Sequence, residues 1–334
     1  MLPNLTLDIT PAPEEEFISQ TGTLRDGSLL INREGLKNPV SQSNSNEQNY
    51  LIPESAEFVV RHNELHVLGK LGEGGQGCVM KMHHMPTNQP VAVKEFRIDL
   101  TSEQMLAQVK KEIRTLYSLK HSGIVPCFGA WFMDGKVFFA LKYCSRGSLG
   151  DLKKIIPESI IKGIAYQLLD SFVYLKQCHV IHRDLKPHNI LVDEQGKVLL
   201  TDFGVAAAVE SSMPMNMSWV GTASYMSPER LASQKYNWQT DMWSLGLTLL
   251  ELITKVIPFS NHPTLFDLLD AIETQPAPIP RDGSLSNEMV DILEKLLEKN
   301  PSDRPDPEIL LEHPWFEDAD VFKSQQWLLF NTQN

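Results

Sequence analysis

The run from His182 to Asn189, His-Arg-Asp-Leu-Lys-Pro-His-Asn, contains the side chains most suited to chemistry. Asp184 can accept a hydrogen bond from a hydroxyl group and orient it for attack on phosphorus. Lys186 can neutralise charge on a phosphoryl group in transfer, and Asn189 can hold a divalent cation through its amide oxygen. We interpret His182 as a packed structural residue. The segment predicts a phosphoryl-transfer loop with Asp184, Lys186 and Asn189 as its catalytic residues.

A second acidic position, Asp202, follows this loop across an expected hairpin. Strands are predicted around 190–192 and 198–200, and Asp202 lies 13 residues after Asn189, at the start of Asp-Phe-Gly. A carboxylate there is suited to a magnesium ion that bridges two phosphates. Asp-Phe-Gly alone could be an ordinary turn, but its place after the hairpin argues against chance. We predict that Asn189 and Asp202 are the metal ligands.

A glycine-rich segment between two expected strands is suited to binding phosphates. Glycine lets the backbone approach a phosphate closely and adopt positive φ. A dinucleotide fingerprint needs a helix after the glycines, whereas here a strand, 78–82, follows them, so a hairpin lid over a nucleotide is favoured. An ordinary tight turn is the alternative for this segment taken alone. The predicted nucleotide-binding residues are Leu71, Gly72, Glu73, Gly74, Gly75, Gln76, Gly77, Cys78 and Val79.

Lys94 ends the apolar run 91–93 and follows the glycine-rich segment at a distance that lets it reach nucleotide phosphates. A lysine in this place needs an anion to orient it. Glu112 lies on the next expected helix, 102–119, and an ion pair between Lys94 and Glu112 would fix that helix against the cleft. The alternatives are a lysine that simply leaves the core and a glutamate in the charged face 110–112.

The expected elements divide the chain into a strand-rich part and a helix-rich part. Periodicity predicts the helix 102–119 in the first part and helices 158–177, 240–253 and 287–297 in the second. Apart from the hairpin, the predicted strands are 66–69, 78–82, 90–96, 127–132 and 136–143. This pattern predicts an α+β fold with a small β-rich N-lobe, a larger α-helical C-lobe and a cleft between them.

Composition and charge exclude several classes of protein. The chain has 334 residues, of which 42% are hydrophobic, so it can bury a substantial core. A net charge of −12 without a long basic stripe argues against nucleic-acid and membrane partners, and no apolar run approaches the roughly 18 residues of a membrane span. The cysteines lack zinc-site spacing, so free thiols in a reducing, cytoplasmic compartment are expected at Cys78, Cys127, Cys144 and Cys178.

The first 64 residues read as a partly irregular extension that could contain a docking segment. The all-polar stretch 41–49 is predicted to be a linker or a disordered segment. A small hairpin around Asp26-Gly27 fits turn chemistry, and the apolar residues 17–18 and 29–31 could dock onto the folded body. The apolar residues within 2–9 fit a loose nuclear-export spacing, which leaves nuclear shuttling open, or a patch that packs on the body.

Together these residues resemble the eukaryotic protein kinase family over residues 65–318. The resemblance implies the two-lobed kinase fold, ATP and Mg²⁺ as cofactors, an adenine-binding hinge at about 142–147 and a C-terminal tail at 319–334. It also implies that Glu229 pairs with Arg304 and that a buried helix carrying Asp241 supports the catalytic loop. The residues it assigns to structural support are His182, Arg183, Phe203, Glu229, Asp241 and Arg304.

The same resemblance extends the nucleotide site beyond the glycine-rich segment. Leu141 resembles the gatekeeper, and Lys142-Tyr143-Cys144 resembles the hinge that hydrogen-bonds adenine. Every catalytic position of the family is filled, which argues against a catalytically dead scaffold. The further residues implied to bind ATP are Ala92, Lys94, Glu112, Leu141, Lys142 and Cys144.

The segment 220–230, Val-Gly-Thr-Ala-Ser-Tyr-Met-Ser-Pro-Glu-Arg, closely resembles the MAP kinase kinases. In that family two hydroxyl residues upstream of this segment are phosphorylated, and Ser218 falls at the second site. Ser212 precedes Ser218 with five residues between them, a spacing that resembles the plant-type members, and Ser211 is the alternative first site.

This closer resemblance implies a dual-specificity kinase that phosphorylates Thr and Tyr in the activation loop of a downstream MAP kinase. An upstream MAP kinase kinase kinase would activate it, and Arg183 could bind the added phosphate and order the loop 205–217. A Ser/Thr kinase of a neighbouring group is the alternative. The family's basic docking cluster is missing beside Leu5-Thr6-Leu7, and the apolar tail after Trp315 could dock the upstream kinase or finish a helix on the C-lobe.

Overall fold

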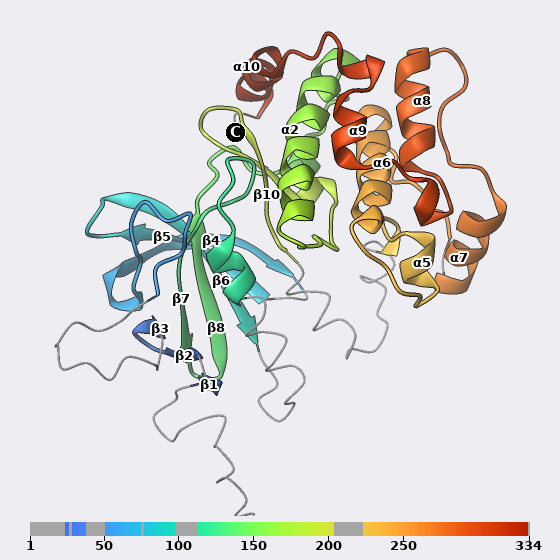
Figure 1. The fold of residues 1–334 in the computed structure, drawn as a ribbon. Helices are drawn as coiled ribbons and strands as arrows, with labels where there is room; N and C mark the ends of the chain where they lie inside the picture. The colour runs from blue at the N-terminus through green and yellow to red at the C-terminus, as the bar shows by residue number, and fades with distance from the viewer. Residues whose placement is uncertain are drawn as a thin grey trace, which may run out of the picture.

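The computed structural model describes residues 24–26, 29–37, 51–74, 77–97, 113–203, 223–262 and 264–332. Within these ranges the chain forms the two lobes that the sequence predicts, as Figure 1 shows. The N-lobe is built on a five-stranded antiparallel sheet, and the C-lobe consists of helices and a two-stranded hairpin. No helix of the described ranges is both long and apolar enough to cross a membrane.

The N-lobe sheet has the strand order β4-β5-β6-β8-β7 and confirms the predicted strands. In its register Val79 lies opposite Lys94, and Ala92 lies opposite Leu141. Because alternate side chains of a strand share a face, these four residues lie on one face of the sheet. The strands are β4 (Leu65–Gly74), β5 (Gly77–His84), β6 (Gln89–Arg97), β7 (Cys127–Met133) and β8 (Lys136–Lys142).

The C-lobe is arranged around the helix α2 (Glu158–Gln177), which begins directly after Pro157. Apolar residues at helical spacing bury most of its circumference in the largest core cluster. The three helices predicted for this part of the chain are confirmed to within one residue at each end. The other helices are α5 (Pro228–Leu231), α6 (Gln239–Thr254), α7 (Leu265–Thr274), α8 (Asn287–Leu296), α9 (Pro307–Leu311) and α10 (Val321–Asn331).

Short elements complete both lobes, and some of them carry the site. The predicted hairpin is confirmed as β9 (Ile190–Val192) paired with β10 (Val198–Leu200). The helix predicted at 102–119 is described over 113–118. The 3-10 helices are η1 (His62–Glu64), η2 (Leu149–Asp151), η3 (Pro187–Asn189), η4 (Pro301–Asp303) and η5 (Pro314–Phe316).

Part of the N-terminal extension is more regular than the sequence indicates. The strands β1 (Leu24–Asp26), β2 (Leu29–Asn32) and β3 (Gly35–Lys37) form a separate three-stranded sheet. The hairpin is confirmed, and within the segment 29–31 the docking is confirmed for Ile31, which is fully buried in an N-lobe cluster. The third strand was not predicted, because three residues give too short a pattern. The stretch 41–49 and residues 17–18 lie outside the described residues.

The C-terminal tail forms α10, which packs against α2. Ser324 and Leu328 of this helix are fully buried, whereas Phe322 and Phe330 are exposed. The helix supports the prediction that the tail finishes the C-lobe, and it leaves the docking of an upstream kinase untested.

Candidate active site

A cavity of about 500 Å³ lies between the N-lobe sheet and the C-lobe hairpin. This volume falls within the range of about 300–1,000 Å³ that small-molecule sites occupy. Apolar side chains from both lobes line it, which suits a flat aromatic ring, and a cation and a carboxylate lie at one end. The lining residues that the sequence predicted for ATP are Leu71, Gly72, Val79, Ala92, Lys94, Leu141, Lys142 and Cys144.

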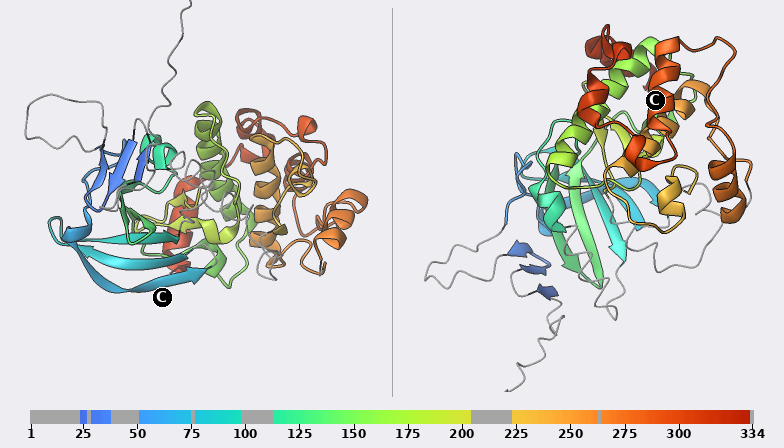
Figure 2. Two further views of the ribbon diagram at one scale, coloured as in Figure 1. Left: turned by 90° about the horizontal axis from the view of Figure 1, so that it is seen from below. Right: turned by 45° about the vertical axis from the view of Figure 1, so that its right-hand side comes forward.

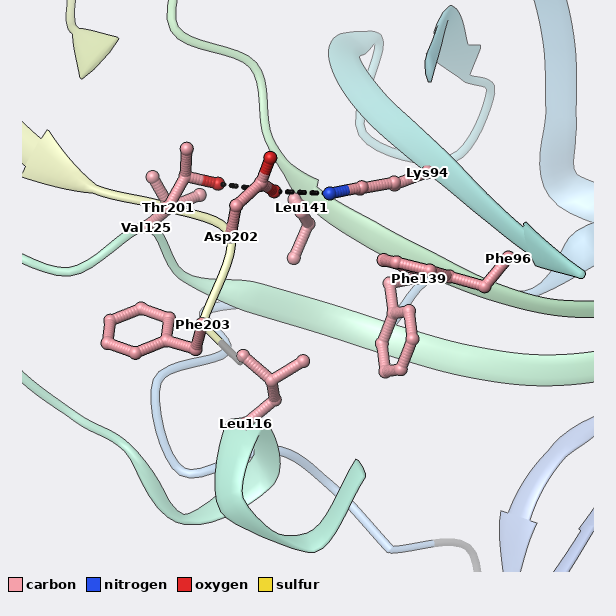
Figure 3. Close-up of a pocket in the computed structure, with 9 residues that line it drawn as sticks. All are labelled: Lys94, Phe96, Leu116, Val125, Phe139, Leu141, Thr201, Asp202 and Phe203. Atoms are coloured by element: carbon pink, nitrogen blue, oxygen red, sulfur yellow. Dashed lines mark hydrogen bonds and ion pairs between the residues drawn. The ribbon is translucent and has the colours of Figure 1, made fainter. Parts of the chain in front are cut away.

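The Lys94 ammonium reaches across the cavity to Asp202. Lys94 Nζ lies 2.7 Å from Asp202 Oδ1, and Figure 3 shows the two side chains meeting between the lobes. Burial alone would raise the pKa of Asp202, but the charge and hydrogen bond of Lys94 outweigh it and hold that pKa below its usual value. Asp202 is therefore a carboxylate at neutral pH. Its φ of 63° is a left-handed conformation that few residues other than glycine adopt, and such strain is common at functional sites.

The Asp184 carboxylate is held from two sides. Lys186 Nζ donates to its two oxygens at 2.9 and 3.1 Å. Asn189 Nδ2 donates to Asp184 Oδ2 at 2.8 Å and to the Asp184 carbonyl oxygen at 2.7 Å. The structure thus brings together the three residues predicted to be catalytic, and their carboxylate has a fixed orientation.

The backbone of the catalytic loop is anchored by Asp241 on α6. Its carboxylate accepts hydrogen bonds from the backbone N–H groups of His182 (2.7 Å) and Arg183 (2.9 Å). Burial raises the pKa of Asp241 despite these donors. Arg183 has a φ of 70°, so the carboxylate holds the loop in a conformation that it would not adopt by itself. The predicted support of the loop by Asp241 is confirmed.

His182 is fully buried, as the prediction of a packed structural residue requires. Its Nε2 lies 2.9 Å from the Thr201 carbonyl oxygen, and the Asp184 backbone N–H donates to its Nδ1 at 3.3 Å. A carbonyl can only accept, so Nε2 donates, and the ring is the neutral Nε2–H tautomer. Burial lowers the pKa of His182 and keeps it neutral. The ring therefore connects the catalytic loop to the strand that ends at Asp202.

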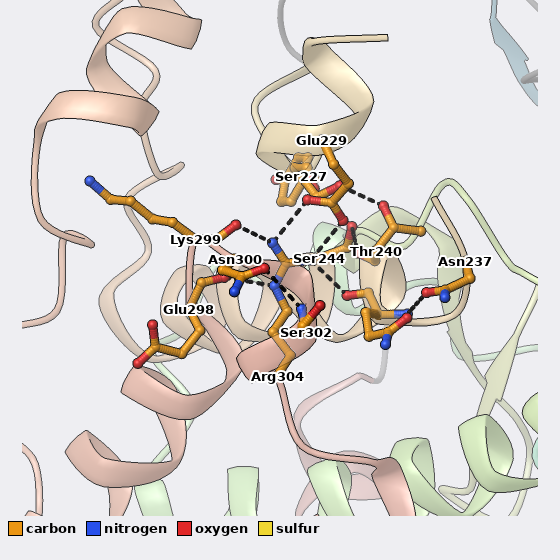
Figure 4. Close-up of polar contacts among 12 residues, drawn as sticks. Ser227, Glu229, Asn237, Thr240, Ser244, Glu298, Lys299, Asn300, Ser302 and Arg304 are labelled. Atoms are coloured by element: carbon orange, nitrogen blue, oxygen red, sulfur yellow. Dashed lines mark hydrogen bonds and ion pairs between the residues drawn. The ribbon is translucent and has the colours of Figure 1, made fainter. Parts of the chain in front are cut away.

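The predicted pair of Glu229 and Arg304 is confirmed as a buried, bidentate ion pair. Arg304 Nη1 and Nη2 donate to the two Glu229 carboxylate oxygens at 2.7 and 2.9 Å, as Figure 4 shows. Arg304 also donates to the carbonyl oxygens of Gln239, Glu298 and Lys299. Burial alone would raise the pKa of Glu229, but Arg304 outweighs it and lowers that pKa. The pair ties α5 to the segment after α8.

Other predicted residues lie elsewhere or outside the described ranges. Glu73 pairs with Lys70 in the exposed part of the β4–β5 hairpin. Cys78 precedes Val79 on β5 and so points to the other face of the sheet. Gly74 ends β4 and Gly77 begins β5, on either side of the hairpin turn. The predicted positions outside the described residues are Gly75, Gln76, Glu112, Ser211, Ser212 and Ser218.

The donor set fits a magnesium ion. Thr201 N donates to the Asn189 carbonyl oxygen at 3.0 Å, which brings Asn189 beside Asp202. Asn189 uses its amide nitrogen on Asp184, so its amide oxygen is the atom suited to a cation, and Asp202 is ionised. Carboxylate and amide oxygens are the ligands that Mg²⁺ prefers. In the described residues, no group of three or more His, Cys, Asp or Glu could by itself hold a metal ion, so substrate phosphates and water would complete the coordination.

Comparison with known proteins gives the family. Residues 65–316 match the protein kinase domain. The chain is 34% identical to a mitogen-activated protein kinase kinase of Nicotiana tabacum, named SIPKK, over 96% of this chain and 93% of the relative. It is 33% identical to mitogen-activated protein kinase kinase 2 of Arabidopsis thaliana, over 95% and 90%. The chain belongs to the MAP kinase kinase family of protein kinases. A relative from Drosophila melanogaster, dual specificity mitogen-activated protein kinase kinase dSOR1, is 36% identical over 77% and 72%.

The cavity of this MAP kinase kinase includes residues that the sequence reasoning missed. Leu191 lies on β9 between Asn189 and the hairpin turn, where strand alternation next to the catalytic loop could have identified it. Val125 and Thr201 reach the cavity because β10 lies beside the segment before β7, a contact without a sequence signal. Tyr143, Ser145 and Gly147 also line the cavity and fall within the predicted hinge, whereas Ser148, Asp151 and His188 are further lining residues that the sequence reasoning missed.

Proposed function

We propose that this MAP kinase kinase transfers the γ-phosphoryl group of ATP to Thr and Tyr in the activation loop of a MAP kinase. The observation that carries the proposal is the Asp184 carboxylate, which Lys186 and Asn189 hold next to the strand end bearing Asp202. The name of the Drosophila relative, which includes dual specificity, supports transfer to both kinds of hydroxyl.

The residues of the site divide the reaction between them. Asp184 accepts the hydrogen bond of the substrate hydroxyl and takes its proton as the oxygen attacks phosphorus. Lys186, whose ammonium contacts that carboxylate, offsets the charge of the phosphoryl group in transfer. Lys94 binds the nucleotide phosphates, either after it releases the Asp202 carboxylate or while it still contacts it. The apolar lining of the cavity positions the adenine ring.

Asn189 and Asp202 would hold Mg²⁺ with the nucleotide phosphates. The ion would neutralise charge on the phosphate oxygens when bound. The low pKa of Asp202 keeps this ligand ionised at neutral pH. The hydrogen bond from the Asn189 amide nitrogen to Asp184 fixes this side chain and leaves its amide oxygen for the ion.

Activation is proposed to follow phosphorylation of Ser212 and Ser218 by an upstream MAP kinase kinase kinase. Support comes from Arg183, whose Nε is buried without a hydrogen-bond partner among the described residues. Its guanidinium lies 6.0 Å from the Tyr236 ring, and the Arg230 guanidinium lies 5.5 Å from the same ring. Two cations beside the same ring suit a phosphate. We further propose a catalytic domain at 65–318 that acts in the cytoplasm.

The test is an in vitro assay of the Ser212→Glu, Ser218→Glu protein against a panel of MAP kinases. Thr and Tyr phosphorylation are read separately by mass spectrometry. Phosphorylation of both residues, above the level given by the unmodified protein, is the expected result. The same protein carrying Asp184→Asn is the control and should lose the activity. Transfer to Thr alone would favour a Ser/Thr kinase of a neighbouring group, and no gain from the acidic residues would contradict the activation sites.

A further inference from the structure

The small sheet of β1, β2 and β3, residues 24–37, lies against the N-lobe away from the cavity. Figure 2 shows its dark blue strands beside the helix that is described over 113–118. Strands β2 and β3 both pack against β7. Ile31 and Leu36 lie opposite each other in the β2–β3 register and are only 0% and 2% exposed. Such a small sheet needs its apolar face to be covered, so the contact with β7 determines its place.

The helix at 113–118 shares one apolar cluster with this sheet. Ile113 and Tyr117, four residues apart and therefore on one helix face, are buried in the same cluster as Ile31 and Leu36. Burying an apolar side chain of this size contributes about 1.5–3 kcal/mol, so the cluster fixes the helix firmly.

Hydrogen bonds from the segment after the sheet hold the same helix end. The Leu51 backbone N–H donates to the Leu36 carbonyl oxygen at 2.8 Å. The Glu54 N–H donates to the Tyr117 carbonyl oxygen at 2.8 Å. The Tyr117 hydroxyl accepts from the Ala130 N–H on β7, also at 2.8 Å. The helix is thus connected to the extension and to the sheet by directional contacts as well as by packing.

The same helix reaches the active site through Leu116. This residue lines a small cavity with Lys94, Asp202 and Phe203, as Figure 3 shows. Leu116 also packs against both the N-lobe cluster and the large C-lobe cluster. A continuous set of contacts therefore runs from Ile31 and Leu36 through the helix to the residues that surround the Lys94–Asp202 pair.

We propose that residues 24–37 act as a brace that positions the helix 113–118, and through Leu116 the Phe203 and Asp202 backbone, for nucleotide binding and phosphoryl transfer. The proposal rests on the phosphoryl-transfer site described above, but not on the identity of the protein substrate. Leu36 and Ile31 are positioning residues, since neither is among the residues that line the two cavities.

The test compares Leu36→Ala with Leu293→Ala. Leu293 is a fully buried leucine of α8, a helix that Figure 1 shows on the side of the C-lobe remote from the N-lobe sheet, so its truncation removes the same atoms away from the site. Melting temperature, affinity for fluorescent Mg–ADP, and the kcat and KM for ATP of the activated protein are measured for each. If loss of the brace leaves the helix correctly placed for nucleotide binding in only about a tenth of the molecules, the Mg–ADP affinity of Leu36→Ala falls about tenfold. Leu293→Ala should melt earlier with unchanged affinity.

Further variants separate positioning from stability. Leu36→Met conserves volume and should restore nucleotide affinity. Leu116→Ala combined with Leu36→Ala should weaken binding by less than the product of the two single effects, because both act through one helix. Hydrogen exchange within 113–118 should rise in Leu36→Ala and not in Leu293→Ala.

Equal Mg–ADP affinities for Leu36→Ala and Leu293→Ala, at similar losses of melting temperature, would overturn the proposal and leave the sheet as a stabilising element only. If Leu36→Ala does not unfold cooperatively, Ile31→Val is used instead, since it is a smaller truncation at the same contact. Its melting temperature and Mg–ADP affinity are then compared with those of Leu293→Ala in the same way. Failure of the unmodified protein to bind Mg–ADP would instead count against the proposed function itself.

Discussion

The two walls of the cavity are held in different ways. On the C-lobe wall, the carboxylates of Asp184 and Asp241 and the His182 ring each have fixed partners and are buried. On the N-lobe wall, Lys94 meets a carboxylate of the opposite wall, and Leu71 at the glycine-rich hairpin is 45% exposed. The comparison shows a preorganised catalytic wall facing a wall that can adjust to the nucleotide.

Two ion pairs illustrate this difference between a fixed wall and an adjustable wall. The Glu229–Arg304 pair is shielded from water, with side chains 3% and 0% exposed, and Arg304 has three additional carbonyl acceptors. Asp202 of the Lys94–Asp202 pair is 25% exposed and faces the cavity. The first pair can only support the fold, whereas the second can exchange partners when phosphates and a metal enter.

The largest expected effect comes from breaking the support of the C-lobe wall. Arg304→Leu leaves the Glu229 carboxylate buried without its cation, which should lower the free energy of unfolding by about 3–5 kcal/mol. Urea unfolding followed by circular dichroism measures the change. Arg304→Leu combined with Glu229→Leu should recover part of the loss, because no buried charge is left alone. A double variant no more stable than the single one would show that the loss does not come from the uncompensated carboxylate.

Breaking the pair that crosses the cavity should affect activity more than stability. Lys94→Met keeps most of the alkyl chain but removes the charge, so phosphoryl transfer should fall by about 100- to 1,000-fold. The free energy of unfolding should change by only about 1 kcal/mol, because Asp202 retains contact with water. Initial rates and urea unfolding are measured on the same preparation.

The matched control for this change is Lys136→Met, which breaks the 2.8 Å pair with Glu95 in the same sheet but outside the cavity. This variant should keep full activity. A loss of stability in Lys94→Met as large as that of Arg304→Leu would remove the distinction between the two pairs.

The smallest effect is expected from the pH dependence of His182. Burial lowers its pKa in the folded state, so near neutral pH the unfolded state binds more protons and stability rises with pH. The contribution of His182 to stability is complete when the pH is above the ordinary histidine pKa of about 6.5. It is lost as the pH falls toward the lowered pKa of the folded state. Between these values it amounts to roughly 1 kcal/mol for each pH unit.

Urea unfolding at intervals from about pH 7.5 to 5.5 measures this slope against the unperturbed histidine value. His182→Phe should flatten the profile. Burial also lowers the pKa of His121, so the difference between the two proteins, rather than the total slope, is the quantity of interest. Identical slopes would show that a neutral His182 is not needed in the folded protein.

Much of the site could be predicted because its residues lie close together in the chain. Asp184, Lys186 and Asn189 fall within six residues, and the short β9–β10 hairpin forces Asp202 to return beside them. Strand alternation similarly places Ala92 and Lys94 on one face. The helices of the C-lobe were predictable because their apolar residues repeat at helical spacing over many turns.

By itself, the sequence determined the main strands and helices of the two lobes, their order and the chemical character of the site, since local spacing and backbone preference act over short stretches. Only the tertiary structure decided that Lys94 meets Asp202, that Leu191 and Val125 line the cavity, and that Leu36 is buried against the helix carrying Leu116. These contacts join segments far apart in the chain. They form because the free energy gained by packing the core exceeds the entropy lost when such segments are brought together. A short sequence pattern contains no information about this difference.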